Sequence, residues 1–110
     1  MAASTPVKLA SNIGPALLPL GHHQGKPPIR ITRPVYVVGS RANARLHLVS
    51  NSVSKAHALI VRSNSRTYIR DLASRNKVYI NGDEVREAEL VENDLIKIGT
   101  FTFQYIAGLG

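Results

Sequence analysis

The sequence predicts an all-β fold, an antiparallel β-sandwich of short strands that follows a flexible N-terminal tail. From Lys26 onward, short alternating or β-branched apolar runs are separated by turn signals about every 8–12 residues, a spacing typical of antiparallel sandwiches. The dipeptide Asn81-Gly82 lies between two such runs and is the strongest hairpin signal, because a type I′ turn needs positive φ at both central residues. No segment shows a helical period over about ten residues.

Residues 1–26 form the expected tail. They show neither a strand nor a helix period and are rich in Pro, Gly, Ala and Ser, which is typical of disordered segments. The run PALLPL within them could also be a short docking segment, and this alternative stays open. His22 and His23 have no further ligands at metal-binding spacing, so we expect no metal site. The folded domain is then expected to span residues 27–107.

The expected strands follow one another without a helical interruption. Each is a short run of alternating or consecutive apolar residues. In chain order they are IRITR (29–33), VYVVG (35–39), RLHLV (45–49), HALIV (57–61), RTYIRDL (66–72), the two arms of VYINGDEV (78–85), and LIKI and FTFQYI (95–106) around the turn Gly99-Thr100.

The alternation along these strands predicts a light aliphatic core that contains no tryptophan. An error of one residue in any strand would exchange its buried and exposed sets, because successive side chains point to opposite faces. The expected core members are Ile31, Val35, Val37, Leu46, Leu48, Leu59, Val61, Ile69, Leu72, Ile80, Ile96, Ile98, Phe101 and Phe103.

Size and composition limit the classes of protein. The chain has 110 residues and no cysteine, so we expect one domain at most, with no disulfide framework and no Cys-based zinc site. The absence of cysteine fits an intracellular protein, in the cytoplasm or the nucleus. No run of about 20 apolar residues is present, so we expect no membrane span. We also expect a monomer.

The charge of the chain is uneven. The net charge is +7, but residues 1–82 hold 12 Lys and Arg against one acid (+11), and residues 83–110 hold two against six (−4). A basic main part favours an anionic partner, such as nucleic acid, an acidic lipid surface or a phosphorylated protein. A solvated basic surface without a partner is the alternative.

Three segments between strands concentrate hydrogen-bond donors. They are residues 39–44 (GSRANA), 50–57 (SNSVSKAH) and 73–77 (ASRNK). Binding residues gather on loops that a rigid scaffold holds in place. These loops offer hydroxyl, guanidinium, ammonium and carboxamide groups and no carboxylate, a set that suits an oxyanion ligand better than acid–base catalysis.

The order of these segments resembles the forkhead-associated (FHA) domain family. The matching landmarks are VVGSR, SVSKAHA, IRDLASRN and VYINGDEV, followed by LVENDLIKIG before the last hairpin. The resemblance covers roughly residues 27–106 without an internal gap. It implies a β-sandwich that binds phosphopeptides through basic loops.

The resemblance also implies functions for individual residues. Ser54 would hydrogen-bond the phosphate, Lys55 would lie beside the peptide, and Asn76 would hold the peptide backbone next to the phosphoresidue. Ser74 and Arg75 flank Asn76 and can reach the phosphate or its neighbours.

Four further residues are expected to support the site. His57 resembles the structural histidine that braces the binding loops of the family, and Gly39 is the glycine that opens the first loop. Asn81 and Gly82 form the turn that keeps the sheet in register.

The sequence departs from the family pattern at three places. Most members have arginine directly after the glycine of the first loop; here that position is Ser40, and Arg41 comes one residue later. Both are therefore candidate phosphate contacts. Lys77 and Val78 replace a glycine and a threonine that usually follow the asparagine. Asn93 replaces a common glycine, and asparagine tolerates the left-handed region.

The leading hypothesis is a phosphothreonine-dependent protein interaction module, an adaptor in kinase signalling whose partner is a phosphothreonine-containing protein or peptide. The second is a divergent FHA-like module that binds a protein independently of phosphorylation. Nucleic acid is a weaker candidate, because the four tyrosines lie in expected strands and leave the basic loops without stacking platforms. No catalytic triad, paired carboxylates or phosphate-binding glycine loop is present, so we expect neither an enzyme nor a cofactor.

Overall fold

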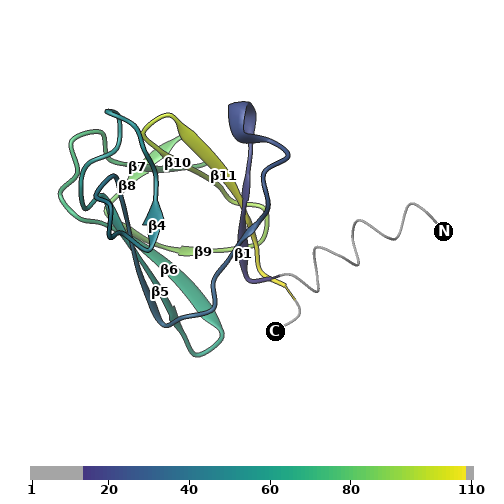
Figure 1. Cartoon of the computed structure of the whole chain (residues 1–110). Helices are drawn as coiled ribbons and strands as arrows, with labels where there is room; N and C mark the ends of the chain where they lie inside the picture. The colour runs from purple at the N-terminus through teal and green to yellow at the C-terminus, as the bar shows by residue number, and fades with distance from the viewer. Residues whose placement is uncertain (1–13, 109–110) are drawn as a thin grey trace.

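Two β-sheets pack face to face in the computed structural model, which describes residues 14–108 (Figure 1). The strands are β1 (Ala16–Pro19), β2 (Ile29–Arg30), β3 (Val35–Gly39), β4 (Leu46–His47), β5 (Ala58–Ser63), β6 (Arg66–Asp71), β7 (Val78–Ile80), β8 (Asp83–Val85), β9 (Glu87–Leu90), β10 (Leu95–Ile98) and β11 (Phe101–Ile106). The six-stranded sheet has the order β2-β1-β11-β10-β7-β8, and the five-stranded sheet has the order β4-β3-β5-β6-β9. All paired strands are antiparallel except β3 and β4, which run parallel. The expected β-sandwich is therefore confirmed.

The six-stranded sheet includes a segment that we expected to belong to a flexible tail. Strand β1 lies antiparallel to β11, with Ala16 opposite Ile106, and its Leu17 side chain is fully buried. The expected domain boundary at residue 27 is corrected, because the sheet already begins at residue 16. The three residues between Pro15 and Pro19 are all apolar and carry no readable alternation, and their burial depends on a strand from the other end of the chain. The rest of the expected tail, residues 1–13, lies outside the described residues.

Replacing Leu17 with alanine is expected to lower the free energy of unfolding by about 2–4 kcal/mol, the usual cost of truncating a buried leucine. Urea unfolding monitored by circular dichroism would measure this. Leu18→Ala is the matched control, because Leu18 is only partly buried on the same strand, and it should cost less than half as much. Equal and negligible effects of both changes would mean that β1 contributes nothing to the fold.

The hairpin between β7 and β8 has the turn that the sequence indicates. Asn81 and Gly82 have φ values of 52° and 89°, both in the left-handed half of the backbone map. Ile80 and Asp83 pair directly across this turn. Asn93 also has a positive φ, 73°, at the position where we expected asparagine to tolerate the left-handed region.

The core contains eight of the expected side chains, but two strands present the opposite face. In β3, Tyr36 and Val38 are buried, whereas Val35 is 51% exposed; in β5, Ala58 and Ile60 are buried. Nearly every position of these strands is apolar, so the sequence has no alternation from which to choose a face. Six expected core residues are only partly buried or exposed: Val35, Val37, Leu59, Val61, Leu72 and Phe101.

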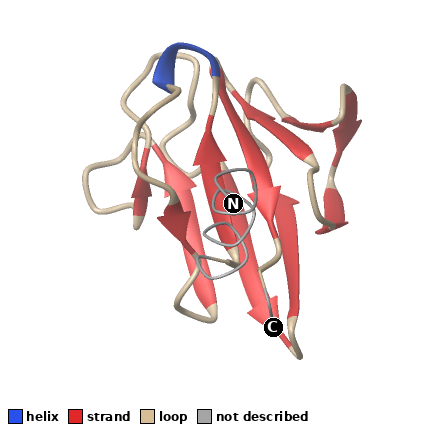
Figure 2. Ribbon diagram, turned by 90° about the vertical axis from the view of Figure 1, so that its right-hand side faces the viewer, coloured by secondary structure: helices blue, strands red, loops and turns tan. Residues whose placement is uncertain are grey.

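One turn of 3-10 helix, η1 (Gly21–His23), lies at one end of the sandwich between β1 and β2 (Figure 2). Its His23 ring stacks on Phe101, the first residue of β11, with ring centroids 4.6 Å apart. The helix therefore caps the end of the sandwich at which β10 turns into β11. Over residues 14–108, no helix has the length and hydrophobicity needed to cross a membrane.

Candidate functional site

Backbone hydrogen bonds join the β3–β4 and β4–β5 loops side by side. The N–H of Ser40 donates to the carbonyl oxygen of Ser54 at 3.0 Å, and the N–H of Arg41 donates to that of Lys55 at 3.3 Å. All four are expected site residues, and these bonds bring them together. The side chains of Arg41 and Lys55 are exposed, whereas Ser40 is half-buried. Two basic groups therefore project from one small region of the surface.

Gly39 permits the close approach of these two loops. A Cβ atom at this position would lie 2.0 Å from the carbonyl oxygen of Lys55, far inside any allowed contact. The neighbouring N–H of His57 donates to the carbonyl oxygen of Val38 at 2.7 Å and continues the pairing into β3. A glycine is therefore required for steric reasons at the end of β3.

His57 connects the second loop to the third. Its ring is fully buried, and its Nδ1 atom accepts a hydrogen bond from the N–H of Ser54 at 3.0 Å. The Nε2 atom lies 2.7 Å from the carbonyl oxygen of Lys77. Since Nδ1 is an acceptor here, Nε2 carries the proton and donates it to that carbonyl. The ring thus supports the loops from below and makes no contact with solvent.

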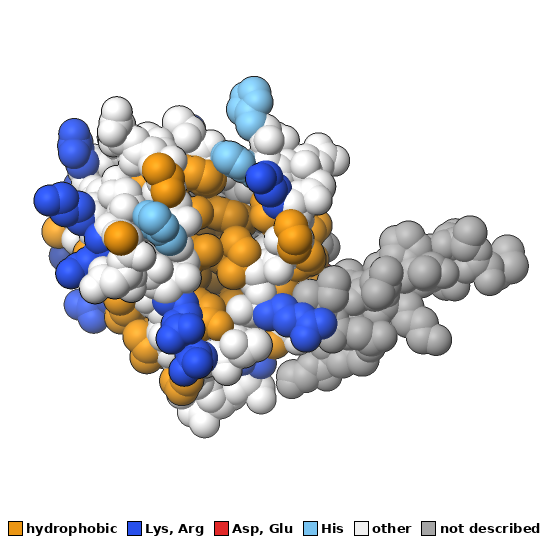
Figure 3. All heavy atoms as spheres, viewed as in Figure 1, with side chains coloured by type: hydrophobic (Ala, Val, Ile, Leu, Met, Phe, Trp, Pro, Cys, Tyr) orange, Lys and Arg blue, Asp and Glu red, His pale blue; other side chains and the backbone are white. Residues whose placement is uncertain are grey.

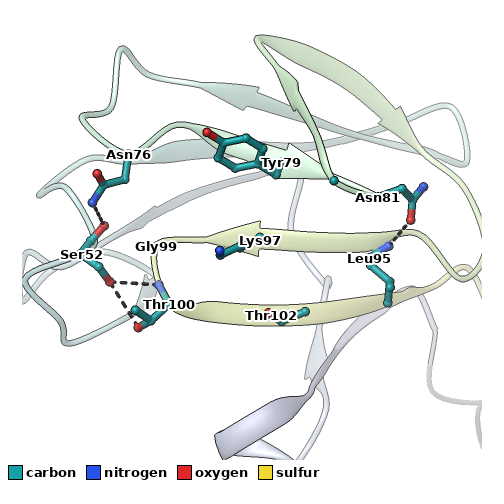
Figure 4. Close-up of a pocket in the computed structure, with 10 residues that line it drawn as sticks. Ser52, Asn76, Tyr79, Asn81, Leu95, Lys97, Gly99, Thr100 and Thr102 are labelled. Carbon is teal, nitrogen blue, oxygen red and sulfur yellow. Dashed lines mark hydrogen bonds between the residues drawn. The ribbon is translucent and has the colours of Figure 1, made fainter.

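Ser52 joins three loops and was not singled out from the sequence (Figure 4). Its Oγ accepts the N–H of Thr100 in the β10–β11 turn at 3.0 Å, and its carbonyl oxygen accepts the side-chain amide of Asn76 at 2.9 Å. A Cβ on Gly99 would lie 2.5 Å from that Oγ, so the turn fits closely against the serine. No local signal indicates these contacts with other loops, because Thr100 and Asn76 lie far from Ser52 in the sequence.

Ser54 and Asn76 keep hydrogen-bonding capacity toward solvent. The Oγ of Ser54 accepts the N–H of Arg75 at 3.1 Å, which leaves the hydroxyl proton free to be donated. Asn76 is exposed and uses its Nδ2 atom on Ser52, which leaves Oδ1 as an acceptor. Ser54 therefore offers a hydroxyl donor, and Asn76 offers the Oδ1 acceptor and its second N–H, on neighbouring loops.

Ser74 lies in a different environment from the other expected ligand contacts. Its side chain is only 3% exposed, and its hydroxyl donates to the carboxylate of Asp71. This arrangement closes the start of the β6–β7 loop, where Ala73 has a positive φ of 54°. The expectation that Ser74 contacts a ligand is therefore corrected, since a buried and already bonded hydroxyl is not available.

The third loop also contains a strained lysine. Lys77 has a φ of 67°, in the region that favours glycine, and the family usually has glycine at this position. Its carbonyl oxygen is the acceptor for His57. Lys77 therefore has a backbone conformation that a glycine would adopt without strain.

The remaining support residues, Asn81 and Gly82, lie away from these three loops. The Nδ2 atom of Asn81 donates to Asp94 at 2.9 Å, and its Oδ1 atom accepts the N–H of Leu95 at 3.0 Å. The β7–β8 turn is therefore fastened to β10, so this pair acts on the sheet and not on the loops.

The basic side chains of the site lack acidic partners. Among residues 14–108 the ion pairs are Arg66–Glu89 (3.9 Å) and Arg70–Glu87 (4.0 Å), both between β6 and β9. Figure 3 shows a face on which the charged side chains of the described residues are all basic. Arg41, Lys55 and Arg75 are exposed without a carboxylate within 4.0 Å in the described part of the chain. Such a group of cations attracts an anionic ligand.

Several of the solved structures that resemble this chain are FHA domains. The FHA domain of a Chlamydia trachomatis protein is 27% identical with a TM-score of 0.76, and the match covers 83% of this chain and 94% of that one. A Synechocystis sp. protein is 28% identical with a TM-score of 0.72, over 82% and 94% of the two chains. Mycobacterium tuberculosis EmbR, solved in complex with a low-affinity phosphopeptide, is 23% identical with a TM-score of 0.76, over 99% of this chain and 30% of that one.

The family comparison agrees with these structures. A search of curated proteins finds no match. The sequence pattern of the FHA domain matches residues 36–99, more than half of the chain, and includes all three loops described above. The chain therefore belongs to the FHA domain family.

Proposed function

We propose that this FHA domain binds phosphothreonine-containing proteins or peptides through its β3–β4, β4–β5 and β6–β7 loops. The observation that supports this most directly is the hydroxyl of Ser54, whose proton is free to be donated. Its loop carries the unpaired cation Lys55 and is hydrogen-bonded to the loops that carry Arg41 and Arg75. A phosphate brings about −1.5 to −2 charges and three acceptor oxygens. Hydrogen bonds from cations to such oxygens are roughly twice as strong as neutral ones.

In this proposal the residues of the β4–β5 and β6–β7 loops make three kinds of interaction. Ser54 donates its hydroxyl proton to the phosphate, and Lys55 and Arg75 neutralise its charge. Asn76 holds the peptide backbone beside the phosphothreonine through its free Oδ1 atom. About three or four such bonds, with most of the peptide still hydrated, correspond to micromolar affinity at best once the entropy of association is included.

The biological setting follows from this ligand class. Phosphothreonine is made by protein kinases, and a module that recognises it brings its own chain to a kinase product. We therefore propose an adaptor function in kinase signalling. Structures with the same fold include EmbR, which was solved with a phosphopeptide, and a domain from a study of phosphothreonine-dependent FHA interactions. At 23% and 21% identity these share the fold, and the ligand class proposed for this chain rests on its own loops.

Ser54→Ala is expected to weaken phosphopeptide binding about tenfold or more, because one hydrogen bond to a charged acceptor contributes roughly 1.5–3 kcal/mol. Isothermal titration calorimetry with a phosphothreonine-peptide library and its unphosphorylated twin would measure the change. Ser63→Ala, at the exposed last residue of β5, is the matched control. Equal binding of both peptide sets by the unmodified domain would refute the proposal and favour the phosphorylation-independent module.

Arg41→Ala is expected to cost tenfold or more in affinity, since the planar guanidinium can bind two phosphate oxygens at once. The backbone of Arg41 is fixed beside Lys55, whereas Ser40 is half-buried and its carbonyl oxygen accepts a hydrogen bond from Nε2 of His47. Arg41 therefore takes over the contact that most of the family makes one position earlier.

The reciprocal variants separate Arg41 from Ser40. Ser40→Arg should bring no gain in affinity, and the double change Ser40→Arg with Arg41→Ala should not restore what Arg41→Ala loses. Normal binding by Arg41→Ala together with a strong gain for Ser40→Arg would show that Arg41 is a bystander.

A further inference from the structure

A groove runs over the outer face of the six-stranded sheet, beyond the three loops (Figure 4). Its volume is about 790 Å³, and its floor consists of side chains from β7, β10 and β11. Tyr79, Lys97 and Thr102 form one row across these strands, because Lys97 pairs with Tyr79 on one side and with Thr102 on the other. The groove is therefore a feature of the rigid sheet and not of a loop.

One end of this groove is part of the candidate phosphopeptide site. Ser52, Asn76 and Thr100 line this end, and the side chain of Asn76 donates a hydrogen bond to Ser52. Arg75 precedes Asn76 in the chain, and its N–H donates to Ser54. The other end is lined by Asn81. Residues 76–81 span at most about 16 Å, the length of a fully extended chain of this size, so the groove accommodates at most about five peptide residues. A peptide held at Asn76 can continue directly into it.

The chemistry of the groove is that of a cationic, hydroxyl-rich surface with an apolar rim. Lys97 is the single charged side chain among its lining residues, and it makes no ion pair with any residue in the range 14–108. The nearest acidic position in the same row is Glu84, which pairs with Tyr79 on β8 and lies two strands away from Lys97. Leu95 is 45% exposed at the rim. Such a surface fits a peptide with an acidic side chain and an apolar neighbour.

We propose that this groove binds the residues that flank the phosphothreonine and that Lys97 selects an acidic side chain among them. The inference rests on the proposed phosphopeptide function and extends it to sequence preference. It assigns the outer sheet face as a specificity-determining surface for the same ligand. An acidic residue at one position of the peptide would therefore bind more tightly than alanine, and a lysine less tightly.

The test uses capped phosphothreonine peptides and fluorescence polarisation. The core peptide is Ala-phosphothreonine-Ala, and the extended peptides add about five alanine-based residues on one side or the other, with Glu, Ala or Lys at each successive position. One position on one side is expected to favour Glu over Ala by about threefold to fivefold, the size of an exposed charge pair. Lys97→Glu is expected to reverse this preference, so that Lys binds better than Glu at that position.

Arg33→Glu is the matched control, because it makes the same change of net charge at an exposed residue outside the groove. It should leave the positional preference intact. The inference is overturned if the affinity is the same for Glu and Lys at every peptide position. It is also overturned if Lys97→Glu and Arg33→Glu change the positional preferences in the same way. A core peptide that does not bind at all contradicts the phosphopeptide function itself, so the two failures are distinguishable.

Discussion

Gly39→Ala is expected to destabilise the domain by about 4 kcal/mol or more and to abolish phosphopeptide binding. The added Cβ would lie 2.0 Å from the carbonyl oxygen of Lys55, and backbone atoms cannot yield as a flexible side chain can. Overpacking costs about 1–3 kcal/mol. Moving the two segments apart would also break the backbone hydrogen bonds between residues 38–41 and residues 54–57, which contribute about 0.5–1.5 kcal/mol each. Chemical unfolding and peptide titration would measure the two effects.

Gly21→Ala separates this steric effect from the general cost of replacing glycine. Gly21 has a φ of 62°, and nothing lies within 4 Å of the Cβ that alanine would add. This change should therefore cost only about 1–2 kcal/mol, the penalty of a left-handed alanine, and leave peptide binding unaltered. If the two alanine variants were equally stable, the close approach of the loops at Gly39 would not be rigid.

His57→Ala is expected to lower the free energy of unfolding by about 3–5 kcal/mol, because it opens a cavity in the core and leaves two partly buried backbone groups without their partners. These groups are the N–H of Ser54 and the carbonyl oxygen of Lys77. The same unfolding experiment on His22→Ala, at an exposed residue, provides the control. Ser54→Ala should cost about 1 kcal/mol at most, since only the bond from Arg75 is lost.

The two variants at the site should therefore separate stability from affinity. His57→Ala is expected to lower mainly the free energy of unfolding. Ser54→Ala is expected to lower mainly the affinity for the phosphopeptide, while the domain stays folded. Equal losses of stability would identify Ser54 as a structural residue and would remove the main support for a phosphate contact at this position.

Local chemistry explains the parts of the fold that the sequence alone predicts. The turn at Asn81-Gly82 needs positive φ at both residues, and only a few residue types supply it without cost. The alternation in β10 and β11 likewise selects one face. Strand β1 has no such signal, because Pro15 precedes it, Pro19 is its last residue, and only its pairing with β11 makes it a strand. In β3 the apolar residues fall on both faces, and packing decides which are buried.

The candidate site also contains residues that the sequence predicts and residues whose contacts only the structure shows. The segments that contain Ser54, Arg75 and Asn76 resemble those of the FHA family, and this resemblance predicts that the three residues belong to one site. Ser74 stands in the same segment, yet its hydroxyl is buried against Asp71. Ser52 shows the opposite case, because its contacts with Asn76 and the β10–β11 turn depend on the folded arrangement of three loops. Sequence motifs identify a loop, but only the structure shows which of its side chains reach solvent.

The pairing of β1 with β11 also determines how this domain can be joined to other proteins. Gly14 and Gly108 approach so closely that a Cβ on either would strike the backbone of the other. The opposite end of β11 begins directly after Thr100, whose N–H donates to Ser52 in the β4–β5 loop. Strand β11 has six residues and is therefore about 20 Å long. A host chain can therefore enter and leave at one point, far from the ligand loops. The domain is suited to insertion into a surface loop of a host, or to circular permutation, without a tether that crosses its binding face.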